Sequence, residues 1–201
     1  MTHTPVSEQE LIEEFLPVIL DNEAKGILQD LLGHPSLALH FITFDETDTR
    51  KAIRHVQGIL EECYRAGHLK VAMSHENGRL YGYALLFEHP DTSIPRYCHK
   101  IFVFKRYRGH GIGTQLLQAL MLDTRGSCLL CSNELITFYE SVGLEVKGTY
   151  TAPSAQQGFA FTRDLYTGLT IMGSPSAGSF APVFMLNDQD IKQLMVLGAC
   201  L

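Results

Sequence analysis

Three glycines at alternate positions, Gly109, Gly111 and Gly113, form the most specific chemical pattern in this sequence. They stand between a β-like run, residues 97–104, and a helix-like run, residues 113–125. Glycines at a turn from strand to helix allow several backbone N–H groups to point toward one place. The first turn of a helix adds N–H groups that have no internal partner, together with the positive end of the helix dipole. The pattern therefore predicts a binding site for a phosphate group.

Basic residues concentrate beside this loop although the chain has a formal net charge of −6. Runs of charge are usually solvated surface, but the position of this group favours an anionic ligand. The acidic balance of the whole chain argues against non-specific binding to nucleic acid. The basic group comprises Arg96, Lys100, Lys105, Arg106 and Arg108.

Two common phosphate-binding loops do not fit the pattern. A mononucleotide P-loop requires Lys followed by Ser or Thr directly after its last glycine, whereas Thr114 follows Gly113 here. A dinucleotide-binding loop has the spacing G-x-G-x-x-G close to the first strand of a βαβ unit. This loop reads G-x-G-x-G and follows a predicted hairpin.

The segment Arg108-x-x-Gly111-x-Gly113, with Val103 five residues before Arg108, resembles the pyrophosphate loop of the GNAT superfamily of acetyl-CoA-dependent N-acetyltransferases. Residues 132–144 resemble the strand–helix unit that follows in that family, with its Asn, its Tyr-Glu pair and its closing Gly-Leu. The resemblance covers residues 69–165 in element order. It implies an α/β fold with a central mixed, mostly antiparallel, splayed β-sheet flanked by helices.

The resemblance also implies the reaction. The chain is expected to move an acetyl group from acetyl-CoA to a primary amine of a small molecule or a protein, by direct attack in a ternary complex. A non-catalytic module that binds acyl-CoA is the alternative. No metal is expected, and the acidic net charge favours a cationic amine as the acceptor.

The same resemblance assigns residues to the cofactor. The main chain of Phe102 and Val103, near Ile101, is expected to pair with the pantetheine arm. Arg108 is expected either near the phosphates or as a brace of the loop. Backbone N–H groups would hold the pyrophosphate, and these belong to Gly109, His110, Gly111, Ile112, Gly113 and Thr114.

Asn133 fits the family pattern with an offset of one residue. Relatives place a cofactor-contacting Asn seven residues before the catalytic Tyr, whereas Asn133 stands six residues before Tyr139 and Ser132 stands seven before it. Asn133 is therefore expected either to contact the cofactor or only to cap the following helix.

Acetyl transfer to an amine requires a base for the amine, donors for the oxyanion and an acid for the leaving thiolate. By resemblance, Tyr139 is the acid. The positions where relatives often carry a base hold Tyr97 and His99, and an imidazole can take up a proton near neutral pH. His99 is thus the candidate base, with Glu88 and His89 as alternatives.

Periodicity and capping signals predict the elements that position these residues. Ser7 with Glu10 reads as a capping box, and Pro17 is expected to kink or divide the helix that follows. Asn77-Gly78 predicts a tight hairpin turn. Strands are expected at residues 37–44, 69–75, 80–87, 97–104, 127–132, 144–151 and 158–165, and helices at residues 47–66, 113–125 and 134–142.

Three regions are expected along the chain: a helical extension (1–35), the acetyltransferase domain (36–165) and a C-terminal extension of loop plus short helix (166–201). Residues 39–67 and 150–158 are expected to build the acceptor pocket, and the extensions to cover it or to form a homodimer contact. The five cysteines show no disulfide spacing, which favours a cytoplasmic setting. No membrane-crossing run is expected.

Overall fold

A single six-stranded sheet forms the centre of the computed structural model, which describes residues 7–121, 125–179 and 182–197. The strands lie in the order β1-β2-β3-β4-β6-β5. Their bounds are β1 Leu69–Glu76, β2 Arg79–Phe87, β3 Arg96–Val103, β4 Ser127–Cys131, β5 Glu145–Thr149 and β6 Thr170–Gly173. All neighbouring strands are antiparallel except β3 and β4.

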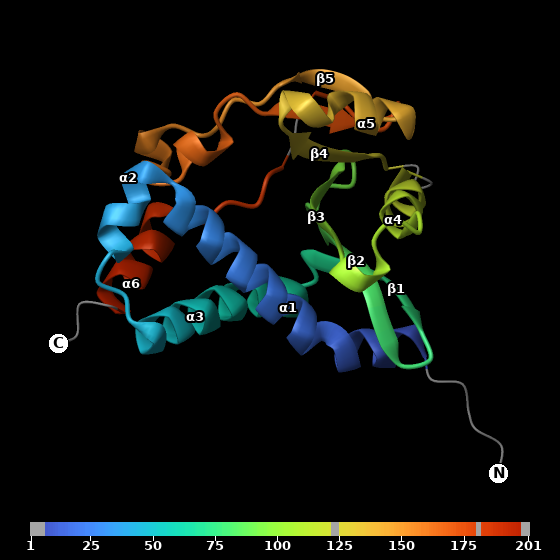
Figure 1. Cartoon of the computed structure of the whole chain (residues 1–201). Coiled ribbons are helices and arrows are strands. Elements are labelled where there is room, and N and C mark those ends of the chain that lie inside the picture. The colour runs from blue at the N-terminus through green and yellow to red at the C-terminus, as the bar shows by residue number, and fades with distance from the viewer. Residues whose placement is uncertain (1–6, 122–124, 180–181, 198–201) are drawn as a thin grey trace, which may run out of the picture.

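Helices cover both faces of this sheet (Figure 1). The α-helices are α1 Glu8–Gly33, α2 Pro35–Ala38, α3 Glu46–Arg65, α4 Ile112–Met121, α5 Ile136–Ser141 and α6 Asp188–Leu197. Short 3-10 turns occur at Leu39–Phe41, Lys105–Tyr107, Asn133–Leu135, Ala155–Gln157 and Arg163–Tyr166. No described helix is long and apolar enough to cross a membrane.

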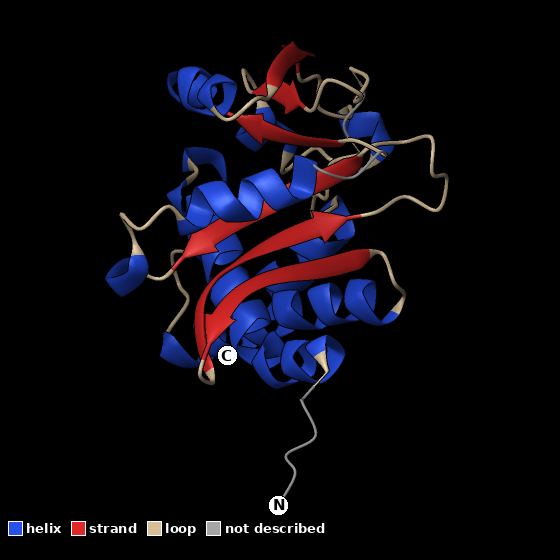
Figure 2. Cartoon of the chain, turned by 90° about the vertical axis from the view of Figure 1, so that its right-hand side faces the viewer, coloured by secondary structure: helices blue, strands red, loops and turns tan. Residues whose placement is uncertain are grey.

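Two apolar clusters fill the layers on the two sides of the sheet. One face of β1–β3 is covered by α1 and α3, and α6 packs against α3. Ile19, Leu60 and Ile191 are fully buried there. The other face packs against α4, where Leu117 and Leu120 are buried. Figure 2 shows α4 crossing the front of the sheet. Residues of β3 therefore alternate between two different environments.

The β1–β2 hairpin follows directly from its turn sequence. Asn77 and Gly78 have φ angles of 51° and 69°, which the tight turn requires and which Asn and Gly tolerate best. Gly82 on β2 lies so close to β3 that a Cβ atom would sit 2.6 Å from the Phe102 carbonyl oxygen. The absence of a side chain at Gly82 therefore sets the position of the last residues of β3.

The parallel strands β3 and β4 diverge soon after they meet. They pair at Arg96 with Ser127 and at Tyr97 with Cys128, and their remaining described residues do not pair with one another. Beyond Tyr97, the main-chain groups on the edge of β3 that faces β4 do not pair with another strand of the sheet. The expected splay of the sheet is confirmed.

Several expectations about local structure are corrected. Residues 37–44 form helical turns rather than a strand, because Pro35 begins a helix at a position that its fixed φ favours. Pro17 does not divide α1, which runs unbroken from Glu8 to Gly33 behind the predicted capping box. The helix expected over 113–125 is described as far as Met121; residues 122–124 lie outside the described part.

The C-terminal part also differs from expectation. Residues 158–165 form turns instead of a strand, and the partner of β5 is β6. Strand β6 belongs to the segment expected to be only loop and helix, yet it lies between β4 and β5 inside the sheet. The proposed boundaries after residues 35 and 165 stay predictions.

Candidate functional site

The glycine loop joins β3 to α4 in the conformation that its composition predicts. Gly109 and Gly111 have φ angles of 81° and 74°, a region that residues with side chains rarely adopt. The first helical hydrogen bond is donated by the Gln115 N–H to the Gly111 carbonyl, 3.0 Å away. The amides of residues 112–114 precede this bond and form the N-terminal end of α4.

One side chain links the loop to the strand, and a second contacts the loop itself. Arg108 Nε donates to the carbonyl oxygen of Val103 at 3.0 Å. His110 Nδ1 lies 2.9 Å from the carbonyl oxygen of Arg108, so this ring nitrogen can donate to it. The Arg108 contact fits the bracing role, one of its two expected roles, which stays a prediction. The His110 ring is directed back to the loop itself.

A cavity of about 510 Å³ lies between this loop, the end of β3 and α5. We call it the loop cavity. Leu117 of α4 and Phe138 of α5 contribute apolar walls. The predicted residues that line it are Ile101, Phe102, Val103, Arg108, Gly109, Gly111, Ile112, Gly113, Thr114 and Tyr139. Most of the residues expected to hold a cofactor are therefore gathered at one place, with the proposed acid beside them.

Tyr139 reaches the loop cavity from α5. Its ring packs on Phe138 with centroids 5.2 Å apart and is partly buried in the cluster beneath α4. Burial, with smaller effects of Cys98 and Cys131, raises the pKa of the Tyr139 hydroxyl to about 12. The hydroxyl therefore keeps its proton throughout the neutral range, as a proton donor must.

Asn133 does not cap α5. The helix begins at Ile136 after a 3-10 turn, and Ser132 precedes that turn. The Oδ1 atom of Asn133 instead accepts a hydrogen bond of 2.9 Å from the hydroxyl of Thr170 on β6. Asn133 lies outside the described lining of the loop cavity, and its expected contact with a cofactor stays a prediction.

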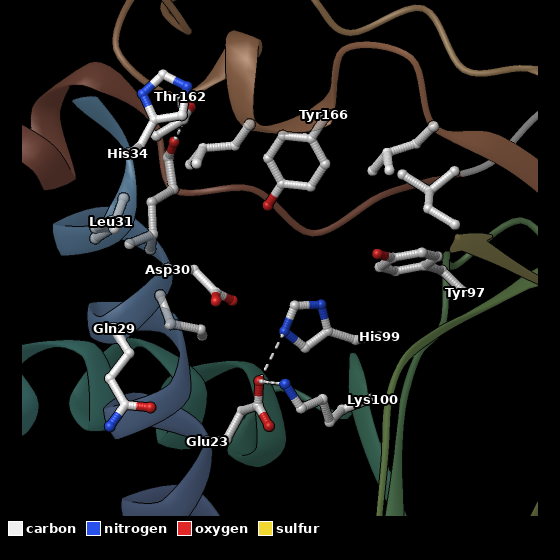
Figure 3. Close-up of a pocket in the computed structure, with 16 residues that line it drawn as sticks. Glu23, Gln29, Asp30, Leu31, His34, Tyr97, His99, Lys100, Thr162 and Tyr166 are labelled. Carbon is white, nitrogen blue, oxygen red and sulfur yellow. Dashed lines mark hydrogen bonds and ion pairs between the residues drawn. The ribbon is translucent and has the colours of Figure 1, made fainter. Parts of the chain in front are cut away.

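A second cavity, of about 540 Å³, opens on the opposite side of β3 (Figure 3). We call it the α1 cavity, because α1 forms one wall. Strand β3 contributes Tyr97, His99 and Lys100. The remaining side is closed by Thr162, Leu165, Tyr166, Leu169 and Leu186. The segments 39–67 and 150–158, expected to form an acceptor pocket, contribute no described residue to this lining.

His99 is brought to the α1 cavity by a bulge in β3. Leu85 of β2 pairs with Lys100 and Leu86 pairs with Cys98, so His99 is the extra residue. A bulge turns adjacent side chains toward the same face, which explains why His99 and Lys100 both line the cavity. The His99 ring also contacts Phe184, with ring centroids 5.4 Å apart.

Glu23 of α1 faces His99 inside the cavity (Figure 3). Its Oε1 atom lies 3.3 Å from His99 Nε2 and 4.0 Å from Lys100 Nζ, and its side chain is only 2% exposed. A buried carboxylate beside an imidazole stabilises the protonated ring and orients it. His99 and Glu23 therefore form a pair suited to accept a proton.

Sequence reasoning missed Glu23, although a signal was present. The residue lies four positions after Ile19 and four before Ile27, within the apolar stripe of α1. A charged residue on a core-facing stripe is rarely buried unless it is paired or functional. That exception to the pattern could have identified it.

The alternative bases, Glu88 and His89, lie elsewhere. Glu88 Oε1 is 3.9 Å from the guanidinium of Arg96, and His89 Nδ1 accepts from the backbone N–H of Asp91 at 3.0 Å. Neither lines the loop cavity or the α1 cavity. Within the described residues, no group of three or more His, Cys, Asp or Glu is arranged to hold a metal ion.

One solved acetyltransferase structure supports the mixed α/β fold of this chain. A histone acetyltransferase HPA2 and related acetyltransferase from Corynebacterium glutamicum is similar over 90% of this chain and 97% of its own, at 17% identity and a TM-score of 0.53. PaiA N-acetyltransferase from Thermoplasma acidophilum, solved with coenzyme A, gives 14% identity over 80% and 92% of the two chains and a TM-score of 0.47. No curated protein sequence matches the chain.

The sequence itself matches a known domain family across the elements that build the loop cavity. Residues 66–146 match the family described as the acetyltransferase (GNAT) domain. This range contains β1 to β4, the glycine loop, α4 and the helix that carries Tyr139. Residues 66–146 are therefore similar to the GNAT acetyltransferase domain, and this similarity supports an acyltransferase.

Proposed function

We propose that this chain is an N-acetyltransferase that moves an acetyl group from acetyl-CoA to a primary amine. The observation that carries the proposal is the position of the two cavities on β3. Ile101 and Val103 line the loop cavity, whereas Tyr97 and His99 line the α1 cavity, and the strand has left β4 between these residues. An acetyl donor in the loop cavity and an amine acceptor in the α1 cavity can meet where β3 has separated from β4.

Two parts of the loop cavity suit two parts of acetyl-CoA, the pyrophosphate and the pantetheine arm. The N–H groups of residues 109–114 suit the pyrophosphate, because they lie at the N-terminal end of a helix after two glycines with positive φ. The unpaired edge of β3 at residues 101–103 suits the amide groups of pantetheine, which would pair with it as an added strand does. The thioester would then lie near Tyr139.

His99 in the α1 cavity and Tyr139 in the loop cavity each carry out one of the two proton transfers. The neutral amine nitrogen attacks the thioester carbonyl carbon, the C–N bond forms, and His99 takes the proton that the nitrogen gives up. Glu23 stabilises the imidazolium that results. When the C–S bond breaks, Tyr139 donates its proton to the sulfur of the leaving CoA. N–H groups on the open edge of β3 supply donors for the carbonyl oxygen.

The glycine loop provides a test of the donor site. We expect Gly111→Val to weaken acetyl-CoA binding by about 10–100-fold, roughly 1.4–2.8 kcal/mol. The substitution forces a side chain onto a residue with φ of 74° and displaces the amides around it. Isothermal titration calorimetry with acetyl-CoA measures the change.

Gly67→Val is the matched control, because Gly67 has a similar φ of 79°, open space around it, and no place in either cavity. It should lower the melting temperature without changing the dissociation constant. Equal loss of affinity in the two variants, or none in Gly111→Val, would count against the proposed donor site. The cytoplasmic setting and the homodimer also stay proposals.

A further inference from the structure

The α1 cavity carries more negative than positive charge among its described lining residues. Two carboxylates, Glu23 and Asp30, face a single ammonium group, that of Lys100. Apart from the imidazoles of His34 and His99, the described lining residues carry a net charge of −1. An acceptor whose reacting amine is neutral would leave this charge unbalanced unless it carried a second, cationic group.

One of these carboxylates has an unused oxygen. Glu23 Oε2 is buried and has no hydrogen-bond partner among the described residues, and the same is true of both ring nitrogens of His99, although Nε2 lies 3.3 Å from Glu23 Oε1. A buried polar atom without a partner costs free energy that a bound donor recovers. Both side chains line the α1 cavity, so a donor bound in that cavity would supply the missing partner of Glu23 Oε2.

The second carboxylate lies further along the same face of α1. Glu23, Ile27 and Asp30 are spaced by four and three residues, so they project from one side of the helix. Seven residues of helix separate the backbones of Glu23 and Asp30 by about 10 Å. Ile27 lies between them, and the facing wall includes the aliphatic residues Leu130 and Leu169. The wall thus alternates charged, apolar and charged along its length.

Asp30 is directed into the cavity. In Figure 3 its carboxylate lies in the space between α1 and the His99 ring. Burial, with smaller effects of Tyr150 and of the charge of Asp30, raises the pKa of the Tyr166 hydroxyl. Asp30 itself is exposed, whereas Glu23 is buried. The cavity therefore has a deep end, with the Glu23–His99 pair, and an accessible end marked by Asp30.

We propose that the acceptor is a small aliphatic diamine that reacts through one amino group and holds the other as an ammonium ion against Asp30. This inference rests on the proposed function and adds the substrate class. At the deep end the reacting nitrogen donates to Glu23 Oε2 and gives its proton to His99. The methylene chain lies along Ile27, and the distal ammonium pairs with Asp30. The products are the mono-acetylated diamine and CoA with its thiol protonated.

The test compares three acceptors of equal length: putrescine, butylamine and γ-aminobutyrate. With the whole chain and saturating acetyl-CoA, kcat/KM for putrescine should exceed that for butylamine by about two- to fivefold, the effect of one partly exposed ion pair. γ-Aminobutyrate should be the poorest acceptor, because its carboxylate meets Asp30. A series from ethylenediamine to hexamethylenediamine then measures the preferred spacing.

Asp30→Asn should reduce kcat/KM for putrescine to that for butylamine. Asp21→Asn is the matched control, since Asp21 lies on α1 outside this cavity and pairs with Lys25. Equal kcat/KM for putrescine and butylamine, or a preference that survives Asp30→Asn, would overturn the inference.

Calorimetry separates this inference from the proposed function. Putrescine and butylamine are titrated into the protein saturated with CoA, which reports binding without chemistry. If no amine is acetylated but putrescine binds more tightly in a manner that depends on Asp30, the proposed function fails and the diamine subsite stands. If neither turnover nor selective binding is seen, both are rejected.

Discussion

Tyr139→Phe is expected to lower kcat by about 10²–10⁴-fold, the usual contribution of a positioned proton donor. The substitution removes only the hydroxyl from a ring that packs on Phe138 and lines the loop cavity. Because burial raises the pKa of this hydroxyl to about 12, the donor is fully protonated when the reaction begins. The loss should appear in kcat and not in the dissociation constant of acetyl-CoA, since the ring that forms the wall remains.

Tyr107→Phe is the control for this prediction. Tyr107 also lines the loop cavity, but its ring packs on Tyr81 beside the glycine loop, with centroids 4.4 Å apart. Its loss of a hydroxyl should leave kcat close to that of the wild type. Full turnover in Tyr139→Phe would show that another group protonates the leaving thiolate. A fall in acetyl-CoA affinity that matches the fall in kcat would point to a binding role.

His99→Ala should produce the second large effect, a fall in kcat of about 10²–10⁴-fold. The imidazole is the group in the α1 cavity placed to accept the proton of the amine, and Glu23 Oε1 lies 3.3 Å from its Nε2. Removal of the ring leaves a space bounded by Phe87 and Phe184, so added imidazole should restore part of the rate. Steady-state kinetics with and without imidazole measure both effects.

Two further variants define the role of His99. Glu23→Gln should also lower kcat, because an amide does not stabilise the imidazolium, but imidazole should not rescue it. His34→Ala is the control, since His34 lines the same cavity while its Nδ1 lies 2.8 Å from the Ser36 hydroxyl. Unchanged kcat in His99→Ala would remove the histidine from the mechanism.

The parts that the sequence predicted are those governed by local rules. Asn77-Gly78 requires positive φ angles, and the two strands beside it formed the expected hairpin. The capping box at Ser7 is present, because its two hydrogen bonds join residues only three positions apart. The turn from strand to helix at the glycine loop was predictable for the same reason, because Gly109 and Gly111 adopt positive φ angles that glycine allows. Its expected contacts with a cofactor stay predictions.

The parts that escaped prediction depend on contacts between distant segments. Strand β6 has only four residues, and it is buried because β4 and β5 pair with it from both sides. Residues 37–44 have apolar side chains that suit either a strand or helical turns. Helical turns form because Pro35 begins a helix and the apolar side chains pack against α1. The pairing of Glu23 with His99 joins α1 to β3, a relation that no local spacing reveals.

The most direct test of the account is the amine dependence of CoA release. Purified protein is mixed with acetyl-CoA, free thiol is followed with a chromogenic reagent, and acetylated amine is quantified by mass spectrometry in the same samples. The account predicts thiol release that requires a primary amine, with one acetylated amine formed for each thiol. Acetyl-CoA binding without amine-dependent release would contradict it and would favour a non-catalytic acyl-CoA-binding module.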